Sequence, residues 1–184
     1  MKNLYIVGAC GSIGTQTLDI VRNSPKEFRV VGMSVGSNLK LAEELIKEFK
    51  PEIVCFKKKE HVLSLSYQPK VVYGDEGLLE IARYHIGEKE VFVNALVGIS
   101  GLLPTVEAIQ ARKEICLANK ETLVVAGDII KNLVKKYNVP LIPIDSEHSA
   151  ILQCLVGEKK SEVKRLIITC LLYTSPSPRD TERS

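Results

Sequence analysis

Two carboxylates separated by one residue, Asp145 and Glu147, follow an apolar stretch and have the chemistry of ligands for a hard cation. Oxygen donors of this kind suit Mg²⁺ or Mn²⁺. The residues alone leave a second interpretation open, in which Asp145 or Ser146 caps a helix and Glu147 complements its dipole. His148 would then be a packed ring. A metal site also needs a further ligand, and the sequence offers no obvious one.

Three glycines, Gly8, Gly11 and Gly14, follow an apolar run and precede apolar residues in helical spacing. Strand, glycine loop and helix in this order favour a dinucleotide, because the backbone can approach a pyrophosphate and the helix N-terminus attracts its charge. The spacing departs from the commonest dinucleotide motif, and glycines also occur in ordinary strand-to-helix turns. The position directly after a buried type of strand favours the dinucleotide.

The loop Gly36-Ser37-Asn38 follows the second apolar run and contains no acid. An enzyme that uses NAD usually places an Asp or Glu here for the ribose 2′-hydroxyl, whereas the first acid after this loop is Glu43. Small polar groups, a helix N-terminus and Lys40 would accept a 2′-phosphate, which favours NADP. The alternative is an ordinary helix start capped by Asn38.

Polar residues also follow the fifth and sixth apolar runs. The small residues of the loop at 94–101 let a helix begin close to a cofactor, although packing alone could explain them. Asn119 is a good N-cap, and Glu121 suits the first helical turn. Lys120 opposes the helix dipole in that turn, so we expect it to bind a phosphate or hydroxyl group.

The elements that must position these residues are short apolar strands alternating with amphipathic helices. This alternation predicts a doubly wound, mainly parallel, Rossmann-like α/β sheet with helices on both faces. The predicted strands are 4–7, 28–35, 53–56, 71–73, 91–93, 114–117 and 139–142, and the predicted helices start near residue 13 and cover 39–49, 61–65, 77–84, 102–112 and 120–137.

Composition limits the function classes. The 184 residues carry a formal net charge of +3 with signs interspersed, and no basic stripe points to nucleic acid. The first strand begins directly after the N-terminal residues, and no apolar run reaches membrane-spanning length, so we expect a cytoplasmic protein. The cysteines lack metal-binding spacing and are expected to be reduced and structural: Cys10, Cys55, Cys116, Cys154 and Cys170.

The domain prediction places a nucleotide-binding domain at 1–155 and the start of a second, catalytic domain at 156–170, with a strand at 163–169. Residues 171–184 contain a Ser-Pro tract without apolar periodicity, so we expect them to be disordered. They resemble adapter or vector sequence joined to an incomplete gene. A natural flexible tail is the alternative.

Taken together, these motifs resemble the 1-deoxy-D-xylulose 5-phosphate reductoisomerase family. Its members use NADPH and a divalent metal to make 2-C-methyl-D-erythritol 4-phosphate in isoprenoid biosynthesis. The resemblance covers residues 1 to about 169 and rests on five segments: 8–19, 95–98, 101–105, Leu117-Ala118-Asn119-Lys120-Glu121, and Asp145-Ser146-Glu147-His148-Ser149-Ala150.

The resemblance implies a role for each matching residue. Substrate, a sugar phosphate, would contact Lys120 and Ser146, and Asp145 and Glu147 would bind Mg²⁺ or Mn²⁺. Cys10 stands where threonine is usual in the family and Ser37 where lysine is frequent. The residues implied to contact NADPH are Cys10, Gly11, Ser12, Ile13, Gly36, Ser37, Asn38, Asn119 and Glu121.

The resemblance also implies a homodimer and a longer protein, with a third metal carboxylate, a lid and a C-terminal helical domain. We therefore expect this chain alone not to turn over substrate. Two other interpretations stay open. One is a different NADP-dependent dehydrogenase of the semialdehyde type, which would need a catalytic cysteine or histidine on a loop. The other is a non-enzymatic dinucleotide-binding module, which would need an effector surface.

Overall fold

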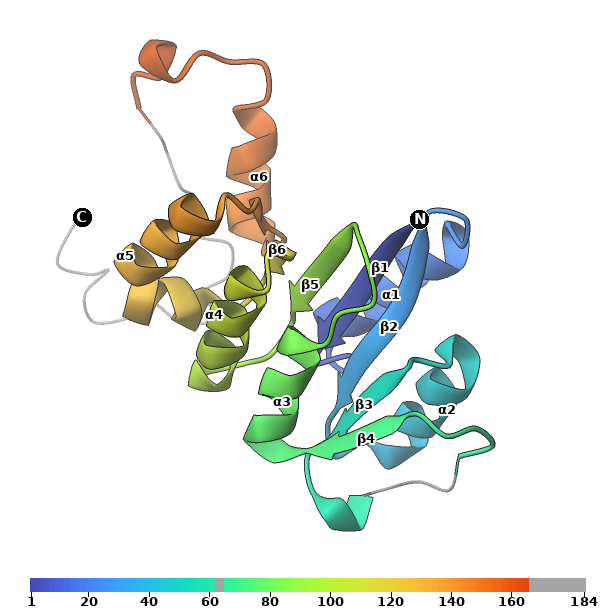
Figure 1. Cartoon of the computed structure of the whole chain (residues 1–184). Helices are drawn as coiled ribbons and strands as arrows, with labels where there is room; N and C mark the ends of the chain where they lie inside the picture. The colour runs from blue at the N-terminus through green and yellow to red at the C-terminus, as the bar shows by residue number, and fades with distance from the viewer. Residues whose placement is uncertain (62–64, 166–184) are drawn as a thin grey trace, which may run out of the picture. The chain divides into compact units, whose positions relative to one another are not determined.

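The computed structural model describes residues 1–61 and 65–165 (Figure 1). The chain divides into two compact units, Met1–Asp145 and the residues from Ser146 onward. The strands of the first unit are β1 (Lys2–Val7), β2 (Phe28–Val35), β3 (Ile53–Phe56), β4 (Lys70–Tyr73), β5 (Glu90–Asn94), β6 (Glu114–Leu117) and β7 (Leu141–Pro143). Its helices are α1 (Ser12–Asn23), α2 (Leu39–Phe49), α3 (Gly74–Arg83), α4 (Leu102–Gln110) and α5 (Lys120–Tyr137), with short 3-10 helices η1 (Lys59–His61) and η2 (Ile99–Gly101).

The seven strands form one sheet in the order β4-β3-β2-β1-β5-β6-β7. Every neighbouring pair is parallel. The chain first winds outward from β1 to β4 and then restarts on the other side of β1 with β5. The predicted doubly wound α/β fold is therefore confirmed, and its topological switch point lies between β1 and β5.

Both faces of the sheet are covered, because successive side chains of a strand point to opposite faces. In β1, Tyr5 and Val7 pack with buried residues of α3, α4 and α5. Leu4 and Ile6 pack on the other face with α1 and α2. Figure 1 shows the same two groups of helices flanking the sheet. Each fully buried aliphatic side chain adds about 1.5–3 kcal/mol to folding, so these two layers supply much of the stability of the sheet.

Strand register brings the loops of the candidate site to one edge. Val7 pairs with Asn94, and Asn94 pairs with Leu117. On the other side of β1, Val35 pairs with Phe56. The loops that follow β1, β2, β3, β5 and β6 therefore leave the sheet side by side at its carboxyl edge.

Local capping sets the helix limits that the sequence predicted correctly. Asn38 and Asn119 accept hydrogen bonds from backbone N–H groups in the first turns of α2 and α5. Both helices end at left-handed residues, Lys50 at φ 45° and Asn138 at φ 51°. The predicted limits of β2, β3 and β6 also agree with the structure.

Several predicted element limits are wrong. Helix α3 starts at Gly74 rather than at residue 77, because Asp75 and Glu76 suit a first helical turn. Helix α4 stops at Gln110, before Arg112 takes a left-handed φ of 59°. The short helix predicted at 61–65 is replaced by η1, and residues 62–64 lie outside the described part of the chain.

The second unit contains α6 (Ser146–Cys154) and the 3-10 helix η3 (Lys160–Glu162). A strand was predicted at 163–169, but residues 163–165 lie in no strand, and residues 166–169 lie outside the described residues. The tail prediction for 171–184 also falls outside them. The predicted domain limit at residue 155 stays a prediction. None of the helices in the described part of the chain is both long and apolar enough to cross a membrane.

Candidate functional site

The loop after β1 is built so that backbone can approach a ligand at the switch point. Gly8 has φ +86°, and a Cβ on it would lie 2.6 Å from the carbonyl oxygen of Ala95. A Cβ on Gly14 would lie 2.3 Å from the Gly8 oxygen. Neither position accepts a side chain, which explains why two of the three loop positions are glycine. Gly11 has an ordinary φ of −82° and forms the N-cap of α1.

Buried Ser34 on β2 holds this loop in place, and sequence reasoning missed it. Its hydroxyl accepts a hydrogen bond from the Gly8 N–H at 2.8 Å, and its carbonyl accepts one from the Ala9 N–H at 3.0 Å. A serine within an otherwise apolar strand was the available signal, since a buried hydroxyl needs a partner.

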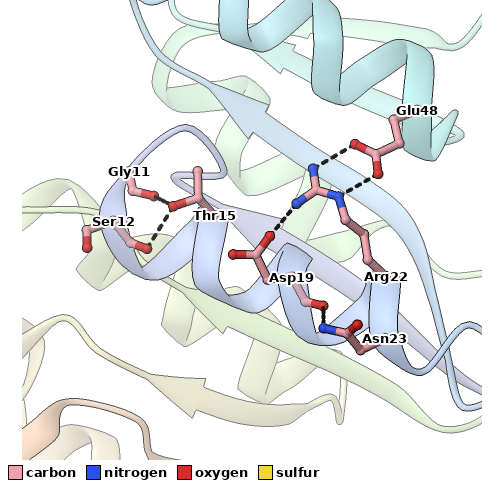
Figure 2. A network of polar contacts seen from close by, with 7 residues as sticks. All are labelled: Gly11, Ser12, Thr15, Asp19, Arg22, Asn23 and Glu48. Atoms are coloured by element: carbon pink, nitrogen blue, oxygen red, sulfur yellow. Dashed lines mark hydrogen bonds and ion pairs between the residues drawn. The ribbon is translucent and has the colours of Figure 1, made fainter.

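The N-terminus of α1 faces out of this loop. Its first turn lies wholly within the described residues and carries no acidic side chain. Gly11 and Ser12 are exposed, and Thr15 donates its hydroxyl back to their carbonyl oxygens at 3.0 and 2.9 Å (Figure 2). The exposed N–H groups and the positive helix end suit an anion such as a pyrophosphate.

Cys10 connects the glycine loop with the loop after β2. Burial raises the pKa of the Cys10 thiol, and a hydrogen bond with the Gly36 backbone opposes that shift. The thiol is therefore neutral near pH 7 and unsuited to nucleophilic chemistry. Two segments that the sequence predicted separately as cofactor contacts meet at this point.

The loop after β2 ends in a helix cap. Asn38 accepts the Leu41 N–H at 3.2 Å through its side-chain oxygen, as the alternative interpretation required. Ser37 and Asn38 are exposed, and the first turn of α2, fully described, has no acid. The position at which an acid would bind a ribose 2′-hydroxyl is therefore occupied by small, neutral groups.

A buried amide network shapes the loop after β5. Asn94 donates to the Gly101 carbonyl at 2.9 Å and to the Thr105 hydroxyl at 2.8 Å. Asn119 donates to the Leu96 and Gly98 carbonyls at 3.0 and 2.8 Å. Sequence reasoning missed Asn94 and Thr105 as positioning residues. The polar end of an apolar strand was the signal for Asn94.

The side chain of Asn119 is thus used within the protein. It also donates to Glu121 at 3.1 Å and accepts the Thr122 N–H at 3.0 Å. Asn119 is only 2% exposed. Its side chain positions the loop beside the switch point, and any direct role toward a cofactor stays a prediction.

Lys120 and Asp145, predicted for substrate and metal, lie together. The Lys120 ammonium is 3.5 Å from Asp145 Oδ1, and the Asp145 side chain is 14% exposed. In the second unit, the Ser146 hydroxyl donates to Glu147 at 2.8 Å. Whether Glu147 shares a cation with Asp145 stays a prediction. Within residues 1–61 and 65–165, no three His, Cys, Asp or Glu side chains are grouped to hold a metal ion.

Comparison with known proteins identifies the family. The family model described as 1-deoxy-D-xylulose 5-phosphate reductoisomerase matches residues 4–127, and the model of the C-terminal domain of that enzyme matches residues 141–172. The chain belongs to the 1-deoxy-D-xylulose 5-phosphate reductoisomerase family. The family resemblance predicted from the motifs is therefore confirmed.

Similar family members share sequence and structure with this chain. A 1-deoxy-D-xylulose 5-phosphate reductoisomerase 2 of Bacillus thuringiensis subsp. konkukian is 54% identical over 172 residues, which are 92% of this chain and 45% of the relative. A crystal structure of DOX-P reductoisomerase with NADPH, fosmidomycin and magnesium is 39% identical, with a TM-score of 0.77, and the match covers 84% of this chain and 39% of that one.

The Zymomonas mobilis reductoisomerase in complex with NADPH is 30% identical, with a TM-score of 0.74, and the match covers 83% of this chain and 41% of that one. The chain thus spans about half the length of the curated relatives it matches, 45% in the case above.

Proposed function

We propose that this chain forms the NADPH-binding part of an enzyme that converts 1-deoxy-D-xylulose 5-phosphate to 2-C-methyl-D-erythritol 4-phosphate in isoprenoid precursor biosynthesis. The observation that carries the proposal is the glycine cradle at the switch point, where a Cβ on Gly8 or Gly14 would collide with backbone. Membership of the family and the NADPH in similar solved structures support it.

The cofactor would bind along the carboxyl edge of the sheet. Ser12 and Ile13 at the start of α1 would hold its pyrophosphate through backbone N–H groups, and Gly11, whose own N–H donates to the Gly8 carbonyl at 3.0 Å, would contact it at the N-cap. The absence of an acid from the described loop Gly36-Ser37-Asn38 supports NADPH over NADH, because no carboxylate there would repel a 2′-phosphate.

Asp145 and Glu147 would supply oxygen ligands for Mg²⁺ or Mn²⁺, and Lys120 and Ser146 would contact the sugar phosphate. The Asp145 carboxylate lies 3.5 Å from the Lys120 ammonium and would hold it at the carboxyl end of β7. When bound, the cation supplies Lewis acidity and NADPH supplies reducing equivalents.

Manganese relaxation titration of wild type against Asp145→Asn tests the ligand assignment. Tight binding unaffected by the substitution would refute it.

Calorimetry with NADPH and NADH tests the cofactor assignment. We expect tighter binding of NADPH and its loss in Gly8→Ala, because the added Cβ would meet backbone at 2.6 Å. Gly127→Ala is a matched control, since a Cβ there meets nothing within 4 Å. Circular dichroism checks that both variants fold. Equal or tighter binding of NADH would contradict the proposal.

The 184-residue chain by itself should bind cofactor without turning over substrate. It spans 45% of its relative, and transition-state stabilisation needs metal, substrate and nicotinamide fixed together. The assay is NADPH oxidation with 1-deoxy-D-xylulose 5-phosphate and Mn²⁺, run on this chain and on a version extended by the regions of a full-length relative. Robust turnover by the shorter chain would overturn this assignment.

We also propose that the whole protein acts as a homodimer in the cytoplasm and does not bind nucleic acid. The net charge of +3 with signs interspersed supports the last point. Light scattering coupled to size-exclusion chromatography of a full-length version tests the dimer, and a monomer at micromolar concentration would contradict it.

A further inference from the structure

A cavity of about 570 Å³ opens at the carboxyl edge beside the glycine loop. Its walls come from the ends of β1, β2 and β3 and from the start of α3. Its lining includes Gly8 and Gly36 and three charged residues, Lys57, Lys58 and Asp75. The cavity therefore runs from the predicted pyrophosphate loop across the end of β2 to the end of β3.

Strand register explains why a residue after β3 reaches the cofactor loop after β2. Val35 pairs with Phe56 as the last residues of the two strands. Gly36 directly follows β2 and Lys57 directly follows β3, so the two residues leave the sheet edge as neighbours. Gly36 leaves open space, since a Cβ on it would meet nothing within 4 Å. The long, flexible stem of Lys57 can extend over this space.

The two lysines that line the cavity follow β3, and the loop after β2 contributes no positive charge. Gly36, Ser37 and Asn38 carry no charge. Lys57 is exposed and makes no ion pair within the described residues, whereas Lys58 lies 3.3 Å from Glu60. Asp75 adds one carboxylate to the cavity lining. Lys57 is thus the lysine with its charge most available to an anion in this cavity.

We infer that Lys57, with Lys58 beside it, binds the 2′-phosphate of NADPH and sets the preference of this chain for NADPH over NADH. The inference rests on the proposed function and goes beyond it, because it transfers phosphate recognition from the loop after β2 to the end of β3. A charge-assisted hydrogen bond from an ammonium to a phosphate oxygen is among the stronger polar contacts.

The test compares Lys57→Gln and the double variant Lys57→Gln/Lys58→Gln with Lys59→Gln. Lys59 carries the same charge but lies 5.8 Å from the ring centre of Tyr73 and does not line the cavity. Dissociation constants for NADPH and NADH are measured by calorimetry on the full chain. Binding of 2′,5′-ADP and AMP isolates the contribution of the 2′-phosphate.

Lys57→Gln should weaken the binding of NADPH and 2′,5′-ADP by about tenfold, the size of one lost charged hydrogen bond. The binding of NADH and AMP should stay unchanged. The double variant should lose more NADPH affinity, and Lys59→Gln should lose none. An unchanged ratio of NADPH to NADH affinity in the double variant would overturn the inference alone. Binding of neither dinucleotide by the wild-type chain would instead overturn the proposed function together with the inference.

Discussion

Strand β5 begins and ends with a buried polar residue, and its two ends are stabilised in opposite ways. Glu90 at the amino end is 7% exposed and sits in a charged cluster. Asn94 at the carboxyl end is fully buried and bonds only neutral groups. One strand of five residues thus connects the amino edge of the sheet with the carboxyl edge, which carries the candidate site.

The amino-end cluster surrounds Glu90 with donors. The Tyr5 hydroxyl donates to Glu90 at 2.6 Å, and the Lys113 ammonium donates at 2.9 Å. Lys113 is fully buried and lies 3.3 Å from the ring centre of Tyr5. His85 contacts the same carboxylate at 2.8 Å, and the Ile86 N–H donates to it at 2.9 Å. The charge is tolerable because its partners replace water.

The contrast shows how the fold separates stability from ligand binding. A charge pair held by several hydrogen bonds is rigid, but its charges are already satisfied. Neutral amides at the other end fix the loop after β5 and add no net charge to the cavity. The field that an anion would meet in the cavity then comes from the helix N-termini and from the charged side chains that line it, Lys57, Lys58 and Asp75.

Removal of Lys113 should have the largest effect. Lys113→Met leaves Glu90 buried without its main cationic partner, so the free energy of unfolding should fall by about 3–5 kcal/mol. Urea denaturation at pH 7 measures it, and NADPH affinity of the folded protein should not change. The double variant Lys113→Met/Glu90→Gln should recover part of the loss. A decrease below about 1 kcal/mol would contradict the importance given to this cluster.

Acid should weaken the amino end selectively. Burial alone would raise the pKa of Glu90, but hydrogen bonds from Tyr5, Ile86, Lys113 and His85 outweigh burial and lower this pKa to about 2. Because the native pKa lies below the ordinary value of 4.5, the stabilisation is complete above about pH 4.5 and is lost as the pH falls toward 2.

The free energy of unfolding should therefore drop by about 2–3 kcal/mol more in wild type than in Glu90→Gln between pH 6 and pH 2.5. Denaturation at stepped pH measures the difference. Glu114→Gln is the control, because Glu114 is partly exposed and pairs only with Lys2 in the described ion pairs. Parallel curves for wild type and Glu90→Gln would refute the low pKa.

The carboxyl end should respond in ligand binding more than in stability. Asn94→Ala leaves the Gly101 carbonyl and the Thr105 hydroxyl without this donor, which should lower the free energy of unfolding by about 1–3 kcal/mol. A loosened loop should also weaken the binding of NADPH by about tenfold. Asn3→Ala, which removes an exposed bond to the Glu88 carbonyl, should change neither quantity. Unaltered NADPH affinity in Asn94→Ala would break the comparison.

An exposed charge network gives the lower limit of these effects. Figure 2 shows the Arg22 guanidinium between Asp19 and Glu48, where it joins α1 to α2 with bonds of 2.5 and 2.7 Å to Glu48. Arg22→Gln should lower the free energy of unfolding by about 0.2–1 kcal/mol, because water and salt screen exposed pairs. Denaturation in low and 1 M salt measures it, and a loss above about 2 kcal/mol would be inconsistent with screening.

The sequence determined most of the strands and helices of the first unit. The caps Asn38 and Asn119 mark the starts of α2 and α5, and the glycine loop after β1 has the role of a close backbone approach. These signals are local, because a cap or a left-handed turn depends on residues within one helical turn. The alternation of strands and helices predicted the α/β class correctly, and the motifs predicted the family correctly.

Only the tertiary structure decided which distant residues meet. Lysine is almost never fully buried unless it is paired, and nothing near Lys113 in the sequence indicates its burial. The placement of β5 between β1 and β6 brings together Tyr5, Glu90 and Lys113. The same lateral pairing, between β2 and β3, brings Lys57 beside Gly36. The sheet order places strands side by side that lie far apart in the chain, so contacts across neighbouring strands have no local signature in a single sequence.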